Sequence, residues 1–264
     1  MNGILKFLIV PVFLFSFVSL SYAGSIKVVP TKVFLGGGKK AEVLKVINEG
    51  DDKVTVQVEA MKWTEDENGV DKYEPTEDIV FFPKIFTVEK GKEWLLRIGA
   101  KSQKTENKEM SYRVFLQEIP VSKPGESQLT MALRLSVPVF IKPTREVRGW
   151  EIEKAVLSKS GLSLRVKNTG NTHITVSKMK AIGLDASGKE VFNVEEAGWY
   201  VLPEAARTFG IKIPGKECRT ASVMKVTAEA AGSGKDTKLD VDRALCPMDE
   251  EKPKATDMDK GKKQ

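Results

Sequence analysis

The chain has almost none of the side chains that catalysis and metal binding most often use. It contains one histidine, His173, and two cysteines among 264 residues. A Ser/His/Asp or Cys/His arrangement would have to use His173, which we interpret instead as a surface histidine on a strand. The sequence therefore predicts a protein that is not an enzyme and that needs neither a cofactor nor a metal.

Phosphate-binding and calcium-binding motifs are missing as well. The glycines 36–38 precede two lysines but lack the spacing of a P-loop, so they predict a hairpin turn. The acidic residues 65–67, with Asp71 and Glu74, could supply paired carboxylates or a weak Ca²⁺ site, yet they lack EF-hand spacing. We favour solvated loop charge, and a carboxylate-dependent hydrolase remains a distant alternative.

The two cysteines, Cys218 and Cys246, lack the CxxC spacing of a redox or metal pair. In an exported protein an isolated pair is most simply a disulfide. We therefore expect a Cys218–Cys246 disulfide, with a metal or redox pair as the less favoured alternative.

Long hydrophobic runs are absent after the N-terminus. Residues 1–23 carry one charge, Lys6, then an apolar stretch, and end in Ser-Tyr-Ala, with small residues where signal peptidase cleaves. The stretch is interrupted by Pro11, and no later segment is long enough to cross a bilayer. The sequence predicts a signal peptide over residues 1–23, a soluble exported protein, and no membrane insertion.

Charge of one sign is not concentrated on any one element. The chain has 42 basic and 36 acidic residues, which gives a formal net charge of +6. Because the basic residues are scattered, we expect no nucleic-acid partner. The tail 247–264 contains charged residues, proline and small residues with almost nothing apolar, so we expect it to be disordered.

What the chain does contain is a series of short alternating segments separated by turns, a pattern that predicts β-strands. Expected strands in the first half are 25–35, 41–47, 53–63, 78–82, 85–88, 93–98, 112–119 and 129–141. The first three read as consecutive antiparallel strands, and residues 64–77 read as a loop.

The second half continues the pattern after an interruption over residues 142–149. Expected strands there are 151–157, 162–166, 172–184, 189–194, 206–213, 221–228 and 238–243. The fold class is therefore all-β, with two immunoglobulin-like β-sandwich domains over residues 24–143 and 144–246.

The most informative segment is the long strand 129–141. Leu129, Met131, Leu133 and Leu135 begin an apolar row that continues on the same face to Ile141. A strand of this length can extend beyond its own sheet, and an unpaired apolar edge attracts other strands. The row predicts a strand lent to a partner, although packing against its own domain is equally compatible with the period of two.

Several strings in this order resemble the first domain of periplasmic pilus-assembly chaperones. They are PTKVFL (30–35), DIVFFPKIFTVEKGKEWLLRIG (78–99), YRVFLQEIP (112–120) and LRLSVPVFIKP (133–143). The second half resembles the same family in VKNTGNTHITVSKM (166–179) and VLPEAARTFGI (201–211).

The resemblance implies a periplasmic chaperone of two immunoglobulin-like domains arranged as a boomerang. It implies that pilus or fimbrial subunits, which lack their last strand, are capped by strand donation and presented for assembly at an outer-membrane usher. The matching donated residues are Leu129, Met131, Leu133 and Leu135.

The resemblance also implies an anchor for the C-terminal carboxylate of the subunit, made in the family by an arginine on the first strand and a lysine on the donated strand. These positions match Lys32, which keeps the charge but loses the bidentate fork, and Pro138, which has neither charge nor N–H. Lys142, Arg134 or Arg145 would then have to contribute.

A structural ion network at the domain junction is the last feature that the resemblance implies. Glu118 and Lys142 match its first-domain members, with Asp240 or Asp242 as the acid of the second domain. The competing hypothesis is an exported two-domain β-sandwich binding or adhesin-like protein, in which strand 129–141 belongs to the core.

Overall fold

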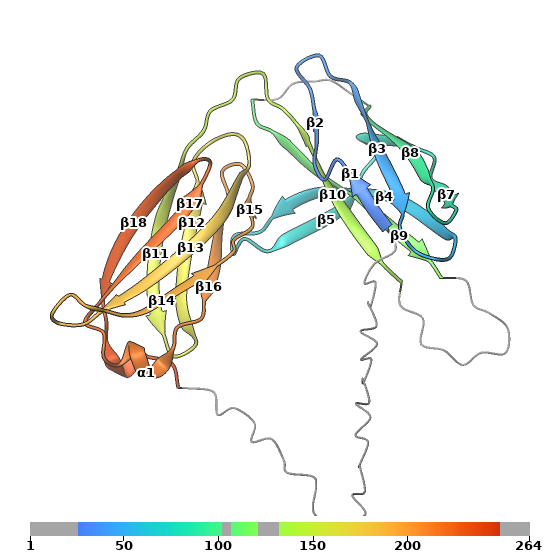
Figure 1. Cartoon of the computed structure of the whole chain (residues 1–264). Helices are drawn as coiled ribbons and strands as arrows, with labels where there is room; N and C mark the ends of the chain where they lie inside the picture. The colour runs from blue at the N-terminus through green and yellow to red at the C-terminus, as the bar shows by residue number, and fades with distance from the viewer. Residues whose placement is uncertain (1–25, 102–106, 121–131, 249–264) are drawn as a thin grey trace, which may run out of the picture.

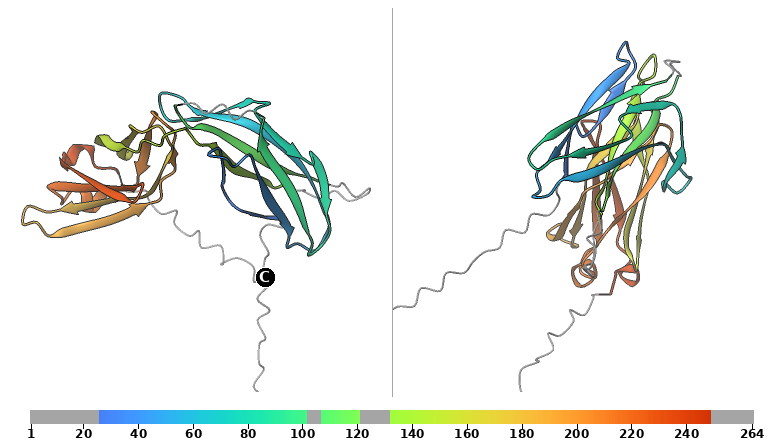
Figure 2. Two further views of the ribbon diagram at one scale, coloured as in Figure 1. Left: turned by 90° about the horizontal axis from the view of Figure 1, so that it is seen from above. Right: turned by 90° about the vertical axis from the view of Figure 1, so that its right-hand side faces the viewer.

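The computed structural model describes residues 26–101, 107–120 and 132–248, which fold into two β-sandwiches. Figures 1 and 2 show that the two sandwiches meet at an angle, like the arms of a boomerang. The predicted all-β fold with two sandwich domains is therefore confirmed.

The first domain consists of two facing sheets. The four-stranded sheet has the order β1-β3-β8-β6: β1 (Ile26–Val29), β3 (Ala41–Asn48), β8 (Glu93–Ala100) and β6 (Ile79–Phe82). The six-stranded sheet has the order β2-β10-β9-β4-β5, with β7 also paired to β4: β2 (Val33–Leu35), β10 (Arg134–Ile141), β9 (Met110–Ile119), β4 (Val54–Glu65), β5 (Asp71–Pro75) and β7 (Ile85–Val88). Because alternate residues of each strand point inward, Val56 of β4 and Leu44 of β3 are fully buried in one core.

The second domain repeats this plan with its own core. One sheet has the order β11-β12-β16: β11 (Trp150–Ser158), β12 (Gly161–Asn168) and β16 (Ala206–Ile211). The other has the order β14-β13-β17-β18, with β15 also paired to β13: β14 (Glu190–Glu196), β13 (Ile174–Leu184), β17 (Val223–Ala230), β18 (Ser233–Asp240) and β15 (Tyr200–Val201).

A disulfide closes the far end of the second domain. Cys218, the last residue of the short helix α1 (Gly215–Cys218), is bonded to Cys246, just after a 3₁₀ turn (Arg243–Leu245), with an S–S distance of 2.01 Å. Both cysteines are buried in the core of that domain. Among the described residues, neither helical turn has the length and apolar character needed to span a bilayer.

The partners of the first strands differ from the prediction. Residues 25–35 were expected to form one strand, but the chain divides into β1, which pairs with β3, and β2, which pairs in parallel with β10 in the other sheet. The next two strands lie in opposite sheets, because β3 pairs with β8 whereas β4 pairs with β9. Alternation indicates that a segment is a strand, but it does not identify the neighbouring strand.

The predicted loop over residues 64–77 is instead part of a hairpin. β4 continues to Glu65, and β5 pairs with it from Met61↔Pro75 to Glu65↔Asp71. Figure 1 shows this β4–β5 hairpin reaching from the first domain to the second. At the turn, a Cβ on Gly69 would lie 2.5 Å from Cα of Arg207, so the hairpin closely approaches β16 of the second domain.

Candidate functional site

Half of β10 has an open edge. On one side β10 pairs with β9 along its whole length, whereas on the other side β2 covers only Val139 to Ile141. Within the described part of the chain, no strand pairs with the segment from Arg134 to Pro138 on that second side. This segment can therefore accept a further strand.

The hydrogen-bond pattern shows which residues face the open edge. The N–H of Glu118 in β9 donates to the carbonyl of Leu133 at 2.9 Å. Since bonding direction alternates along an antiparallel pair, the odd-numbered residues of β10 bond to β9 and the even-numbered ones turn the other way. Arg134 and Ser136 therefore direct their N–H and carbonyl groups outward, while Pro138 has no N–H to offer.

The apolar row of β10 changes from buried to partly exposed along the strand. Val137 and Val139 are buried in the core of the first domain, whereas Leu135 and Leu133 are only half-buried. Leu129 and Met131, the first two residues of the predicted donated row, lie outside the described residues. Apolar surface is thus available beside the open edge at Leu133 and Leu135.

The three predicted anchor cations have different environments. The Nζ of Lys32 lies 4.9 Å from the ring centre of Tyr200 in the second domain, so Lys32 is at the junction. Arg134 forms an exposed ion pair with Glu59, and Lys142 forms one with Glu146. The guanidinium and ammonium groups of Arg134 and Lys142 are therefore already paired with carboxylates.

A buried arginine, Arg113 on β9, was missed by the sequence analysis. It pairs across the ladder with Pro138, and Lys32 precedes the Val33↔Val139 pair on the opposite side of Pro138. Two cations thus flank the strand position where the resembling family has a lysine. The alternating pattern of β9 predicts that Arg113 faces solvent. Only its register opposite Pro138 could have indicated that it lies near the predicted anchor position.

The guanidinium of Arg113 has no carboxylate partner among the described residues. It is 3% exposed, and its Cζ lies 3.9 Å from the ring centre of Trp63. One Nη donates to Ser136 Oγ at 3.2 Å, while Nε and the other Nη are buried without a hydrogen-bond partner. Burial lowers the pKa of Arg113, although an arginine remains charged in a protein. A buried charge with unused donors is suited to binding an acceptor anion.

The structure does not form the ion network predicted from Glu118, Lys142 and Asp240. Lys142 pairs with Glu146, Glu118 lies near the N–H of Leu133, and Asp240 is exposed at the end of β18. Asp242, the alternative acid, caps the 3₁₀ turn through the N–H of Ala244. The prediction fails because Lys142 pairs instead with the carboxylate of Glu146, four residues along the chain.

A different ion cluster joins the two domains. Arg207 of β16 contacts the carboxylates of Glu65 and Asp71, the pair next to the turn of the β4–β5 hairpin, the former at 2.8 Å. Glu65 is fully buried and also accepts the N–H of Leu202 at 2.9 Å. Burial raises the pKa of Glu65, and the bonds from Leu202 and Arg207 partly offset that rise. These two acids are therefore junction residues and not solvated loop charge.

The single histidine also lies at the junction. Glu109 accepts the backbone N–H of His173 at 3.0 Å, and its carboxylate lies 2.7 Å from Nδ1 of the same residue. The imidazole stacks on Phe140 of β10 with ring centres 3.7 Å apart. The expectation of a surface histidine is therefore wrong, because the first domain covers the residue.

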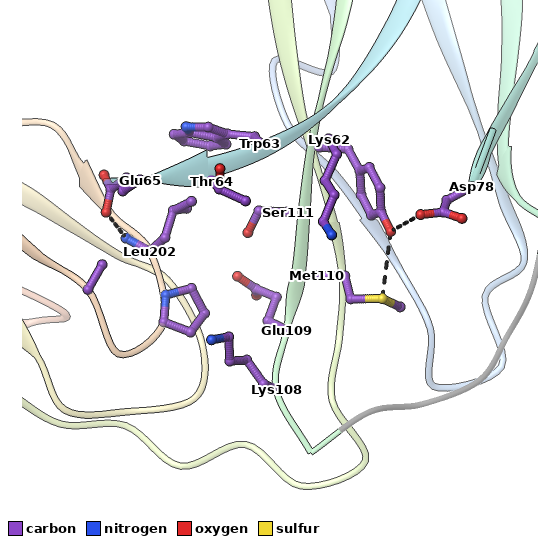
Figure 3. Close-up of a pocket in the computed structure, with 13 residues that line it drawn as sticks. Lys62, Trp63, Thr64, Glu65, Asp78, Lys108, Glu109, Met110, Ser111 and Leu202 are labelled. Atoms are coloured by element: carbon purple, nitrogen blue, oxygen red, sulfur yellow. Dashed lines mark hydrogen bonds between the residues drawn. The ribbon is translucent and has the colours of Figure 1, made fainter. Parts of the chain in front are cut away.

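A cavity of about 440 Å³ lies next to these contacts, between the ends of β4 and β9 and the loop around Leu202. Figure 3 shows the carboxylate of Glu65 accepting a hydrogen bond from Leu202. The carboxylate of Asp78 accepts one from the Tyr112 hydroxyl at 3.0 Å. Lys108 on its rim pairs with Glu204. The cavity is thus lined largely by groups that hold the junction together.

Residues 25–146 match the family model described as "Pili and flagellar-assembly chaperone, PapD N-terminal domain". Comparison with curated protein sequences gives no match.

Solved structures share the fold across both domains. The chaperone–tip adhesin subunit complex CsuC–CsuE of Acinetobacter baumannii aligns with a TM-score of 0.55 and 20% identity, covering 81% of this chain and 98% of that one. The YadV chaperone aligns at 0.54 and 17% identity, covering 82% and 100%. The SafB chaperone complex with the SafA pilin of Salmonella enterica aligns at 0.51 and 17% identity, covering 82% and 96%. At these identities the likeness shows a common two-domain fold.

Proposed function

We propose that this chain captures pilus or fimbrial subunits by donating the open edge of β10, because residues 25–146 match the PapD N-terminal domain model of pili and flagellar-assembly chaperones. The observation that supports this proposal best is the half-paired state of β10, which leaves Arg134 to Pro138 without a neighbouring strand on one side among the residues that the structure describes. The family is non-enzymatic, and capture needs only strand pairing and burial of apolar side chains.

Strand donation uses both the backbone and the side chains of β10. Arg134 and Ser136 supply backbone donors and acceptors to a subunit strand. Leu133 and Leu135, with Leu129 and Met131 before them, fill the apolar groove of a subunit that lacks its last strand. Each fully buried leucine contributes about 1.5–3 kcal/mol to the burial term, so this row supplies most of the attraction.

The C-terminal carboxylate of the subunit is held, in our proposal, by Arg113 and Lys32 together. These two residues flank Pro138 from β9 and from the start of β2, and neither is paired with a carboxylate in the described chain. A guanidinium can hold a carboxylate through two parallel N–H bonds, which restores the fork that the Lys32 position lacks. Arg134 and Lys142 are less suitable because each already has an acidic partner.

The proposed location of the protein is the periplasm, where its partners are found. The signal peptide predicted over residues 1–23 directs export, and we place the mature protein in the periplasm, as the family implies. Its partners are pilus or fimbrial subunits and an outer-membrane usher that receives the loaded chaperone. The disulfide of the second domain is compatible with an oxidising compartment.

The direct test is co-expression of the mature chain with candidate subunits encoded near its gene, followed by isolation of a one-to-one complex. Leu133→Glu should remain folded and fail to capture a subunit, because a charge cannot enter an apolar groove. The matched control is Leu95→Glu on β8, where the leucine is 51% exposed on the other sheet. Capture by Leu133→Glu at the wild-type level would refute strand donation. Unfolding of Leu133→Glu would favour the adhesin-like alternative, in which the row is core.

A further inference from the structure

Arg113 is enclosed by three aromatic rings that differ in exposure. Its Cζ lies 3.9 Å from the ring centre of Trp63, 5.3 Å from that of Trp199 and 5.4 Å from that of Tyr200. Trp63 and Tyr200 are buried, whereas Trp199 is 42% exposed. Trp199 is therefore the outermost of the three covers, and the other two belong to the packed junction.

The backbone at Trp199 is fixed, whereas its side chain is partly exposed and its hydrogen bond lies at the surface. The carbonyl of Trp199 accepts the N–H of Val176 at 2.9 Å, and a Cβ on Gly198 would lie 2.4 Å from the Val176 carbonyl. The indole N–H has one hydrogen bond, an exposed one of 3.2 Å to Asp71 on the β4–β5 hairpin. Rotation of this side chain breaks that exposed hydrogen bond, an edge-to-face contact with Tyr200 at 5.4 Å between ring centres, and the contact with Arg113. It leaves the strand pairing of β15 intact.

From this arrangement we propose that the Trp199 side chain is a gate over Arg113, closed in the free protein through Asp71 and opened when a carboxylate approaches. This inference rests on the proposed function, since it supplies the regulation of the Arg113 anchor. In the closed state, the three aromatic rings around Arg113 stabilise its guanidinium through cation–π contacts, in the absence of a bound anion. In the open state, the unused Nε and Nη donors reach the terminal carboxylate of the captured strand.

The Arg113 anchor, and not the gate, distinguishes a chain end from an internal strand. Only the molecules with Trp199 rotated away can receive the carboxylate, so the observed affinity for a free C-terminus is lowered by the fraction of closed molecules. A backbone segment without a free terminus has no anion with which to displace the ring, and its binding does not depend on the gate. The closed gate therefore reduces the preference for a C-terminus, and removing the gate increases it.

The test uses the mature full-length chain and two strand-length peptides of alternating valine and threonine, one ending in a free carboxylate and one in a carboxamide. Trp199→Ala should bind the acid peptide about ten-fold more tightly than the wild type, because the closed state is removed. Trp94→Ala is the matched control, since Trp94 is 44% exposed on β8 and far from Arg113 in the sheet order. Trp199→Phe keeps a ring but loses the hydrogen bond to Asp71. Its affinity for the acid peptide should lie between those of the wild type and Trp199→Ala.

A second measurement follows the ring itself. With fluorinated tryptophan in the chain, the ¹⁹F resonance of Trp199 should shift on adding the acid peptide and not the amide, while that of Trp94 stays in place. Equal affinities of Trp199→Ala and Trp94→Ala, with acid still preferred over amide, would overturn the gate and leave the anchor intact. Equal binding of acid and amide by the wild type would overturn the anchor and the gate. Failure of the wild type to bind either peptide would overturn strand donation as well.

Discussion

The two domains treat their sheet edges in opposite ways. In the second domain, β18 is an edge strand that, in the described part of the chain, pairs only with β17, and its exposed residues include Lys235, Asp236 and Lys238. In the first domain, the open edge of β10 lies beside the half-buried Leu133 and Leu135. Charged side chains discourage further strand pairing, whereas apolar ones favour it. The same sandwich plan thus gives one domain with a charged edge strand and one with an open edge beside apolar side chains.

The largest effect on this contrast should come from the disulfide. In a Cys218→Ala, Cys246→Ala variant the chain-entropy model predicts a loss of about 3.6 kcal/mol, because the bond closes a loop over a separation of 28 residues. Calorimetry should show a lowered transition for the second domain, while the open edge of β10 is unaffected. A lowered transition for the first domain alone would contradict the independence of the two cores.

Next in size is the ion cluster that joins the domains. Arg207→Met leaves Glu65 buried without its cation and should cost about 3 kcal/mol at neutral pH. Since burial already raises the folded-state pKa of Glu65, this loss should shrink as the pH falls below that pKa and grow as the pH rises through it. Chemical denaturation at several pH values measures the effect. Arg165→Met, which breaks the Arg165–Glu153 pair at partly exposed side chains, should show no comparable pH dependence.

Arg113→Met separates binding from stability. Losing two charge-assisted bonds to a terminal carboxylate should weaken capture by about 1.5–3 kcal/mol. Replacing a buried, unpaired charge by an apolar side chain of similar length should leave the free energy of unfolding unchanged or raise it. Titration calorimetry with the acid peptide and a thermal melt test both parts. A variant that binds normally but unfolds more easily would mean that Arg113 is purely structural.

The smallest effect is expected at the closed edge. Lys238→Val on β18 should change the free energy of unfolding by less than about 0.5 kcal/mol, as surface substitutions usually do. It should nevertheless increase self-association, because it removes one of the charges that protect an exposed strand. Analytical ultracentrifugation compares it with Lys45→Val on β3, a strand with neighbours on both sides. Equal self-association of the two variants would show that β18 needs no such protection.

Local alternation was sufficient to predict both sandwiches, but not the contacts between them. The row Val54, Val56, Val58 identified β4 because burial imposes a period of two on a strand. β5 was missed because its residues, Asp71 to Pro75, are polar and mostly exposed, and Asp71 at its start contacts Arg207 and Trp199 of the second domain. Arg113 was missed and His173 misjudged because their side chains meet the other domain and not the core of their own. Whether an outward side chain meets water or another domain depends on the angle between domains, which no local pattern contains.

Pro138 has a consequence for where a guest strand must stop. A strand lying along the open edge meets backbone donors at Arg134 and Ser136, but none at Pro138. Beyond Pro138 the place is already taken by β2. We infer that Pro138 limits the length of the bound strand and fixes its register, so that the guest chain terminates between Lys32 and Arg113. Pro138→Ala would restore a donor there, and guest peptides longer by a residue should then be tolerated. If Pro138→Ala and the wild type showed the same preference for peptide length in a competition assay, Pro138 would not set the length of the bound strand.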